Sequence, residues 1–144
     1  MEWINKNMSR PVEAIYLPAY LEKRMIQHTR ECLPFETCGL LSGTSNHVSS
    51  IWELESEIKH RYRYFVSKDA VDKTMKAVRS KQEEVLAIYH SHPTAQPVPS
   101  KEDILHHPES QVCMLIVSLQ AEPAVWQGYT IVDSHYFHRP IVVV

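Results

Sequence analysis

The sequence contains little glycine and cysteine and has no excess of positive charge. Its 144 residues include three Gly and three Cys, and the formal net charge at pH 7 is −2. An odd number of cysteines without a Cys-x-x-Cys motif argues against a disulfide framework and favours reduced, buried thiols in an intracellular protein. Without a basic excess, nucleic acid is not expected to be the main ligand.

Long apolar segments are also missing. The longest apolar run, residues 112–117, is far shorter than a membrane-spanning helix, and residues 1–8 lack the apolar core of a signal peptide. We therefore expect a cytoplasmic protein with no membrane contact. A hydrophobic content of 44% over this length suits one domain with a real core. We expect a polar tail at residues 1–10 and a single domain at 11–144.

Hydrophobic periodicity predicts a mixed sheet flanked by helices, of the α/β (α+β) class. Helices are expected at residues 19–33, after a cap at Ser67, and briefly after Ser100. Strands are expected at residues 12–17, 38–42, 48–54, 60–66, 85–90 and 112–118. A closing hairpin is expected from residues 124–132 and 136–144, turning about 133–135.

Several features have more than one interpretation. The basic and aromatic alternation at 60–66 indicates a strand whose basic face is either a solvated edge, which we favour, or a grip for an acidic partner. The apolar end at 141–144 must pair within the sheet or across a homodimer. We interpret His28 as a core-edge residue and His106 and His107 as exposed. Two glycines within residues 39–43 predict tight backbone packing.

The most informative stretch is His90-Ser91-His92-Pro93, followed at a distance by Ser100 and Asp103. Strand side chains alternate, so both histidines emerge on one face. Two histidines and one carboxylate are the ligands of a catalytic zinc site whose fourth position stays open. The alternative is that Ser100-x-x-Asp103 is only a helix cap.

Glu36 lies at the start of an apolar strand. A carboxylate there is commonly the solvated end of the strand. It is also a candidate general base, because burial near a metal changes the pKa of a carboxyl.

The arrangement His90-x-His92, seven residues, Ser100, two residues, Asp103 resembles the JAMM signature of the MPN (Mov34/JAB1) metalloprotease family. The segment from Glu36 to residue 41 resembles the glutamate strand of that family. The order of the predicted elements also agrees, so the resemblance covers roughly residues 12–144. The length is typical of the short prokaryotic members.

The resemblance implies a fold like that of the cytidine deaminases, and a zinc peptidase or isopeptidase. The expected substrate is a ubiquitin-like sulfur-carrier protein, cut after its C-terminal Gly-Gly. By the same resemblance His90, His92 and Asp103 ligate Zn²⁺, Glu36 is the acid/base, and Ser100 helps to hold the oxyanion.

Two other functions remain open. One is a non-catalytic MPN scaffold for protein assembly, although scaffold domains lack the metal ligands that are present here. The other is a RadC-like, DNA-repair-associated protein, whose His-x-His loop is also rich in proline. The segment from Glu36 to Gly39 and the absence of net positive charge argue against the second.

Overall fold

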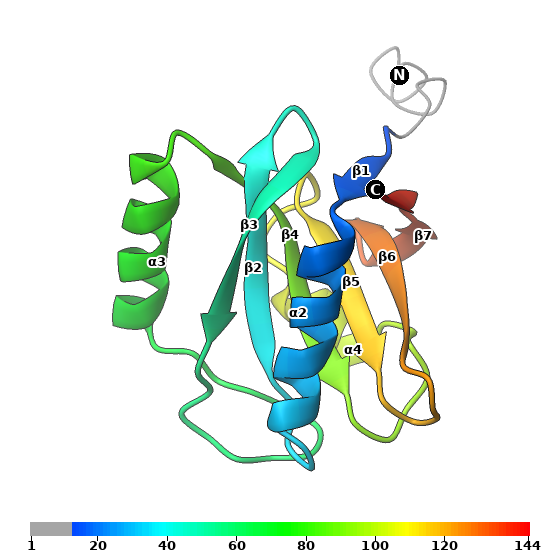
Figure 1. Cartoon of the computed structure of the whole chain (residues 1–144). Helices are drawn as coiled ribbons and strands as arrows, with labels where there is room; N and C mark the ends of the chain where they lie inside the picture. Colours follow the sequence, from blue (N-terminus) through cyan, green and yellow to red (C-terminus); the bar gives the residue numbers. More distant parts are fainter. Residues whose placement is uncertain (1–12) are drawn as a thin grey trace.

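Eight strands and three helices make up the part of the chain that the computed structural model describes, residues 13–144 (Figure 1). The helices are α2 (Ala19–Glu31), α3 (Lys68–Ser80) and α4 (Lys101–His106). The strands are β1 (Ile15–Leu17), β2 (Cys38–Thr44), β3 (His47–Leu54), β4 (Glu84–His92), β5 (Cys113–Ser118), β6 (Val125–Val132), β7 (His135–His138) and β8 (Ile141–Val143). The tail predicted at residues 1–10 lies outside the described residues.

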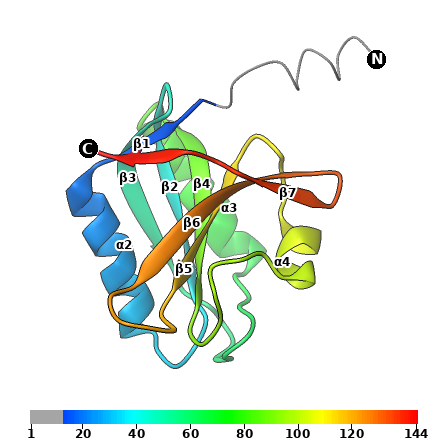
Figure 2. The same ribbon diagram turned by 90° about the vertical axis from the view of Figure 1, so that its right-hand side faces the viewer.

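The strands form one mixed sheet in the order β7-β6-β5-β4-β2-β3-β1-β8. β4 and β5 run parallel, whereas β2 pairs antiparallel with both β3 and β4. Figure 2 shows α2 against one face of the sheet and α4 on the opposite face. The predicted α/β class, a mixed sheet flanked by helices, is confirmed. None of the helices in residues 13–144 is long and apolar enough to cross a membrane.

The face of the sheet under α2 carries the main hydrophobic core. Leu21 and Met25 on the apolar stripe of α2 are buried there against β2, β4 and β5. Burying side chains of this size stabilises the fold by roughly 1.5–3 kcal/mol each. The helix begins after Pro18 and ends at Glu31, two residues earlier than predicted.

The glycines of β2 allow close packing, as the sequence predicted. A Cβ atom on Gly39 would collide with the ring of Tyr89, which lies beside it on β4. A Cβ on Gly43 would collide with the backbone carbonyl of His47. The close approach at Gly39 lets β2 and β4 run side by side under α2.

The predicted strand at residues 60–66 is wrong. Residues 55–67 form an irregular segment, which we call the covering loop. Glu36 N donates to His60 O at 2.8 Å, and Glu57 N donates to Phe65 O at 2.7 Å. These bonds tie the loop to the start of β2 and to itself rather than to a neighbouring strand. Tertiary contacts therefore override the strand pattern, and the basic residues do not lie on a sheet edge.

The closing hairpin is confirmed, but its second strand is shorter than predicted. β6 and β7 pair antiparallel around Asp133 and Ser134, whose φ angles of 49° and 65° suit a two-residue hairpin turn. After Pro140 the chain leaves β6, and β8 pairs in parallel with β1. β7 and β8 lie at opposite ends of the strand order, so the sheet curls until its ends approach (Figure 2). The apolar C-terminus is thus paired within the sheet.

Smaller predictions had mixed outcomes. His28 is buried, and Cys38 and Cys113 are buried free thiols, as expected. His106 is exposed, but the prediction of an exposed His107 is wrong. That ring is half-buried because its Nε2 donates to the Val112 carbonyl at 2.7 Å.

Candidate metal centre and active site

Three side chains from the end of β4 and the start of α4 converge on one point. The Nε2 atoms of His90 and His92 lie 3.2 Å apart. Oδ2 of Asp103 lies 3.1 Å from the first and 3.0 Å from the second. Both histidines are buried. Within residues 13–144 no other group of His, Cys, Asp and Glu side chains brings three ligand atoms together in this way.

The spacing and chemistry of these donors fit a zinc ion. Nitrogen and oxygen ligands held about 2.0–2.1 Å from tetrahedral zinc lie about 3.3 Å from one another, close to the three distances above. The Gln96 carbonyl, 2.8 Å from Nδ1 of His92, can only accept, so Nδ1 donates. In neutral His92 the Nε2 lone pair then faces the Asp103 carboxylate. Two acceptors that face each other need either a proton or a metal ion between them, and a third donor at the same point, Nε2 of His90, favours the metal ion.

A capping box at the start of α4 fixes Asp103. Asp103 N donates to Ser100 Oγ at 3.0 Å, and Ser100 N donates to Oδ2 of Asp103 at 2.9 Å. The interpretation of Ser100 as a helix cap is therefore confirmed. Because Ser100 Oγ acts as an acceptor in this cap, its own O–H remains available to donate to another group.

The carboxylate and imidazoles shift one another's pKa. Burial alone would raise the pKa of Asp103, but hydrogen bonds to His90 and His92 hold it well below its usual range. Burial alone would lower the pKa of His92, but Asp103 and the Gln96 carbonyl raise it above the ordinary value. The cluster thus favours an ionised carboxylate with positive charge beside it.

Glu36 lies immediately before β2, at the same end of the sheet as the three ligand atoms. Its side chain is only 5% exposed. Burial raises the pKa of its carboxyl to about 8; the charge of Asp103 adds to this rise and His92 opposes it. No described residue hydrogen-bonds to its carboxyl group. A buried carboxyl that titrates near neutral pH can both take and return a proton.

Ser91 holds the backbone next to Glu36. Ser91 N donates to Thr37 O at 2.9 Å, and Thr37 N donates to Ser91 Oγ at 2.9 Å. These two hydrogen bonds hold the start of β2 against the end of β4. No role was predicted for Ser91 from the sequence, although strand alternation places it on the face opposite to the two histidines.

Tyr64 is a second residue that the sequence analysis missed. Its ring lies 5.9 Å from the ring of His90, between centroids, at an angle of 38°. It is a half-buried residue of the covering loop, and burial raises the pKa of its phenol. The alternation at 60–66 was the available signal, but it was assigned to a strand.

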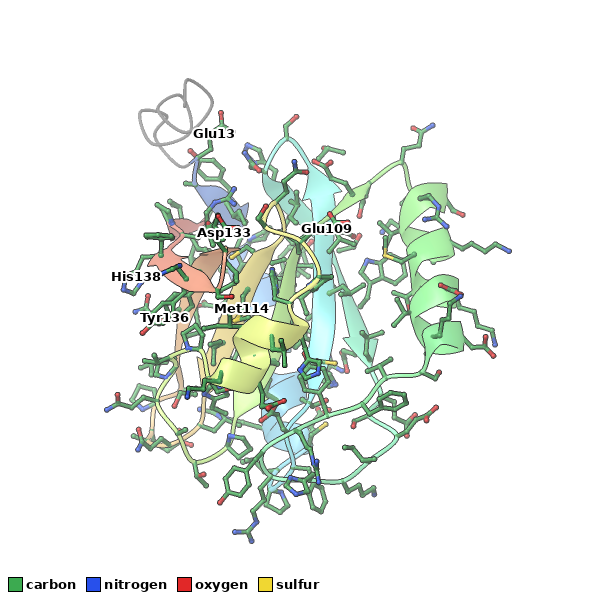
Figure 3. All side chains as sticks on the ribbon, turned by 180° about the vertical axis from the view of Figure 1, so that it is seen from behind. Glu13, Glu109, Met114, Asp133, Tyr136 and His138 are labelled. Atoms are coloured by element: carbon green, nitrogen blue, oxygen red, sulfur yellow. The ribbon has the colours of Figure 1, made fainter. Side chains whose placement is uncertain are left out.

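Two hollows meet at Glu36. The larger, of about 1280 Å³, lies between the covering loop, α3 and α4, and we call it the groove. Figure 3 views this side of the sheet, with α4 toward the viewer and the groove residue Met114 labelled. The smaller, of about 520 Å³, lies beside the end of α2, and we call it the pocket. His90 and Asp103 line the groove but not the pocket, whereas Glu36 lines both.

The five side chains predicted from the sequence therefore lie at one end of the sheet. His90, His92 and Asp103 are in mutual contact. Ser100 is hydrogen-bonded to Asp103. Glu36 is buried nearby, where the charges of Asp103 and His92 shift its pKa. Their catalytic and metal-binding roles stay predictions.

Comparison with known sequences assigns the chain to a family. Residues 18–131 match the family described as prokaryotic homologues of the JAB domain. The CysO-cysteine peptidase of Mycobacterium tuberculosis is 26% identical over 136 residues, which cover 92% of this chain and 93% of that protein. The desampylase of Pyrococcus furiosus is 26% identical over 91 residues, covering 63% of this chain and 65% of that protein.

Solved structures share the fold. A protein from Desulfitobacterium hafniense superposes with a TM-score of 0.81 at 24% identity, covering 90% of this chain and 92% of that one. A structure described as a JAMM metalloprotease-like zinc site in the proteasome and signalosome superposes with a TM-score of 0.57 at 18% identity. It covers 90% of this chain and 99% of that one. At these identities the likeness concerns the fold alone.

Proposed function

The chain belongs to the family of prokaryotic homologues of the JAB domain, and from that premise we propose that it is a zinc-dependent peptidase or isopeptidase. The substrate we propose is a ubiquitin-like sulfur-carrier protein, hydrolysed after its C-terminal Gly-Gly. The names of the two peptidase relatives support this class of reaction.

One observation carries the proposal. Three ligand atoms lie 3.0–3.2 Å from one another beside a buried carboxyl whose pKa is raised to about 8. A metal site alone serves structure as well as catalysis. A metal site with a free carboxyl that titrates near neutrality is the combination needed to activate water.

His90, His92 and Asp103 would hold the zinc. Bound there, zinc would supply Lewis acidity that acidifies water and polarises the scissile carbonyl. Glu36 takes a proton from the attacking water and returns it to the leaving amine. The free O–H of Ser100 donates to the oxyanion that develops on the carbonyl. One such donor typically stabilises a transition state by about 3 kcal/mol.

The groove suits the extended tail of the carrier. It runs past His90 and Asp103 and is lined by apolar side chains such as Leu54 and Ile88. A tail ending in Gly-Gly lets its backbone approach the donors closely, because glycine has no side chain to obstruct it. We assign the acyl half of the substrate to this groove.

The test is cleavage of sulfur-carrier proteins that carry C-terminal extensions, followed by intact mass. We expect loss of the extension at the Gly-Gly terminus with wild-type protein, and no loss with Glu36→Gln. Uncut substrates with zinc-loaded, folded protein would instead favour the scaffold function.

A further inference from the structure

The covering loop brings one aromatic ring against the metal cluster. The ring of Tyr64 lies 5.9 Å from that of His90, between centroids, at an angle of 38°. Two other rings of the same loop are more exposed. Tyr62 is 68% exposed and its ring contacts His60, and Phe65 is 53% exposed. Of these three rings, Tyr64 is the one that packs against a predicted metal ligand.

Hydrogen bonds of the covering loop hold Tyr64 from both sides. Before it in the chain, the carbonyl of His60 accepts from Glu36 N at 2.8 Å. After it, Phe65 N donates to Ser56 Oγ at 3.0 Å. The loop therefore presents the ring of Tyr64 at a defined place above the start of β2.

The floor below this ring comes from two neighbouring strands. Cys38 of β2 and His90 of β4 lie opposite each other in the sheet, and both line the groove, as does Tyr64. Residues opposite each other in an antiparallel pair project from the same face. Burial, and then the charges of the nearby Cys38, Glu36 and Asp103, raise the pKa of the Tyr64 phenol. The ring thus covers the groove at the end where the predicted metal ligands lie.

We propose that the ring of Tyr64 is the roof of the groove at the scissile bond and that it enforces glycine in the substrate tail, which deepens and rests on the proposed function. An extended tail that reaches His90 and Asp103 must pass between this ring and the strands below it. Its side chains would alternate between the two sides. One of the two glycines before the scissile bond therefore faces the ring of Tyr64, and the other faces the floor.

The volume of the ring, rather than its hydroxyl, is what excludes a larger residue. A Cβ atom on the residue that faces the roof would meet the ring of Tyr64, whereas a Cβ on the other residue would meet the strands. Phenylalanine at position 64 should therefore act like tyrosine, and alanine should not. The roof controls one position of the substrate and leaves the other to the floor.

The experiment uses one sulfur carrier with a C-terminal extension, made with Gly-Gly, Ala-Gly or Gly-Ala before the scissile bond. Each form is cut by wild-type protein, Tyr64→Phe, Tyr64→Ala and Tyr62→Ala. Tyr62 is the matched control, because it is a tyrosine of the same loop whose ring contacts His60 instead of a predicted metal ligand. Circular dichroism and zinc content check that every variant is folded and loaded.

Alanine at either position should lower kcat/KM of the wild type by about 10–100-fold, the range for one extra carbon in a tight site. Tyr64→Ala should bring this penalty to within about threefold of one at a single position, while Tyr64→Phe and Tyr62→Ala keep both penalties. The assignment is overturned if the wild type accepts alanine, or if Tyr64→Ala relaxes neither position or both equally. It also fails if Tyr64→Phe relaxes the penalty as much as Tyr64→Ala does.

Binding of the tail alone separates the two proposals, because it does not depend on cleavage. Short peptide amides that end in Gly-Gly, Ala-Gly or Gly-Ala are titrated into metal-free wild type and Tyr64→Ala and followed by NMR. A preference for Gly-Gly that Tyr64→Ala loses at one position supports the roof even if no carrier is cut, in which case only the proposed function fails. Cleavage with the same glycine preference in wild type and Tyr64→Ala keeps the function and removes the roof.

Discussion

Two buried histidine clusters lie on opposite faces of β4, and only one of them resembles a catalytic centre. Tyr89 faces α2, where its hydroxyl lies 2.6 Å from Nδ1 of His28. The next residue, His90, faces the groove and meets His92 and Asp103. The first group has one buried imidazole bonded to a phenol, and the second has two buried imidazoles beside a carboxylate. Burial and a hydrogen bond are therefore not enough to identify a site.

The difference is in the partner and its electrostatic consequence. Burial lowers the pKa of His28, and the charge of Glu53 does not outweigh it. His92 is also buried, yet Asp103 raises its pKa. The phenol of Tyr89 can hydrogen-bond to a neutral His28 ring. The Asp103 carboxylate, by contrast, is stabilised by a positive charge beside it. An ionised carboxylate within 3.1 Å of two imidazole Nε2 atoms is the feature that separates a metal centre from a polar core.

The largest expected effect comes from Glu36, the buried carboxyl beside the metal cluster. Glu36→Gln should lower kcat/KM by about 10²–10⁴-fold, the usual contribution of a general acid/base. Zinc content should stay at the wild-type level, because Glu36 is not among the converging ligand atoms. Steady-state cleavage and metal analysis of the same preparation check both points. Activity within tenfold of wild type would remove Glu36 from the mechanism.

Acid should weaken zinc binding on the groove side. A histidine must be neutral to bind a metal ion, so protons compete with zinc for the imidazole nitrogen. Because the pKa of His92 is raised, loss of affinity should begin above the ordinary imidazole value of 6.5 and then reach about tenfold per pH unit for each displaced proton. Zinc competition titrations across this range measure it. Affinity that is flat as pH falls would contradict the assignment of His92.

On the face of the sheet under α2, a larger side chain at Gly39 should lower stability without changing zinc binding. Gly39→Ala places a Cβ against the ring of Tyr89 and should lower the free energy of unfolding by about 1–3 kcal/mol. Urea unfolding measures the loss, and zinc content should remain unchanged. The same substitution in a Tyr89→Leu background should cost less, because the obstructing ring is gone. Equal costs in both backgrounds would contradict the packing argument.

The smallest effect is expected from the Tyr89 hydroxyl that hydrogen-bonds to His28. Tyr89→Phe removes the partner of His28 but keeps the ring. It should lower the free energy of unfolding by about 1 kcal/mol, the usual value for one hydrogen bond. Cleavage and zinc affinity should match the wild type. A large loss of activity would mean that the two faces of β4 are not independent.

The parts of the site that the sequence predicted are those with local causes. Strand alternation is enough to place His90 and His92 on one face, and the spacing from Ser100 to Asp103 is enough to predict a capping box. Glu36 was a candidate general base from its place at the start of a strand, but only the family resemblance linked it to the two histidines, since no local rule links a glutamate to histidines more than fifty residues away.

The parts that escaped prediction depend on distant contacts. The covering loop has an alternating pattern but bonds to Glu36 and to itself, so no strand forms. The final strand breaks at Pro140 because the curled sheet brings β1 within reach of β8. The carbonyl of Gln96 fixes the tautomer of His92, and backbone atoms carry no sequence signal.

Zinc content of three folded proteins tests the central claim most directly. Wild type and His28→Gln should bind zinc at near-stoichiometric level, and His92→Ala should lose it, as measured by elemental analysis after gel filtration and checked by circular dichroism for an intact fold. A folded wild-type protein that takes up no zinc, or a His92→Ala variant that keeps as much as wild type, would contradict the account.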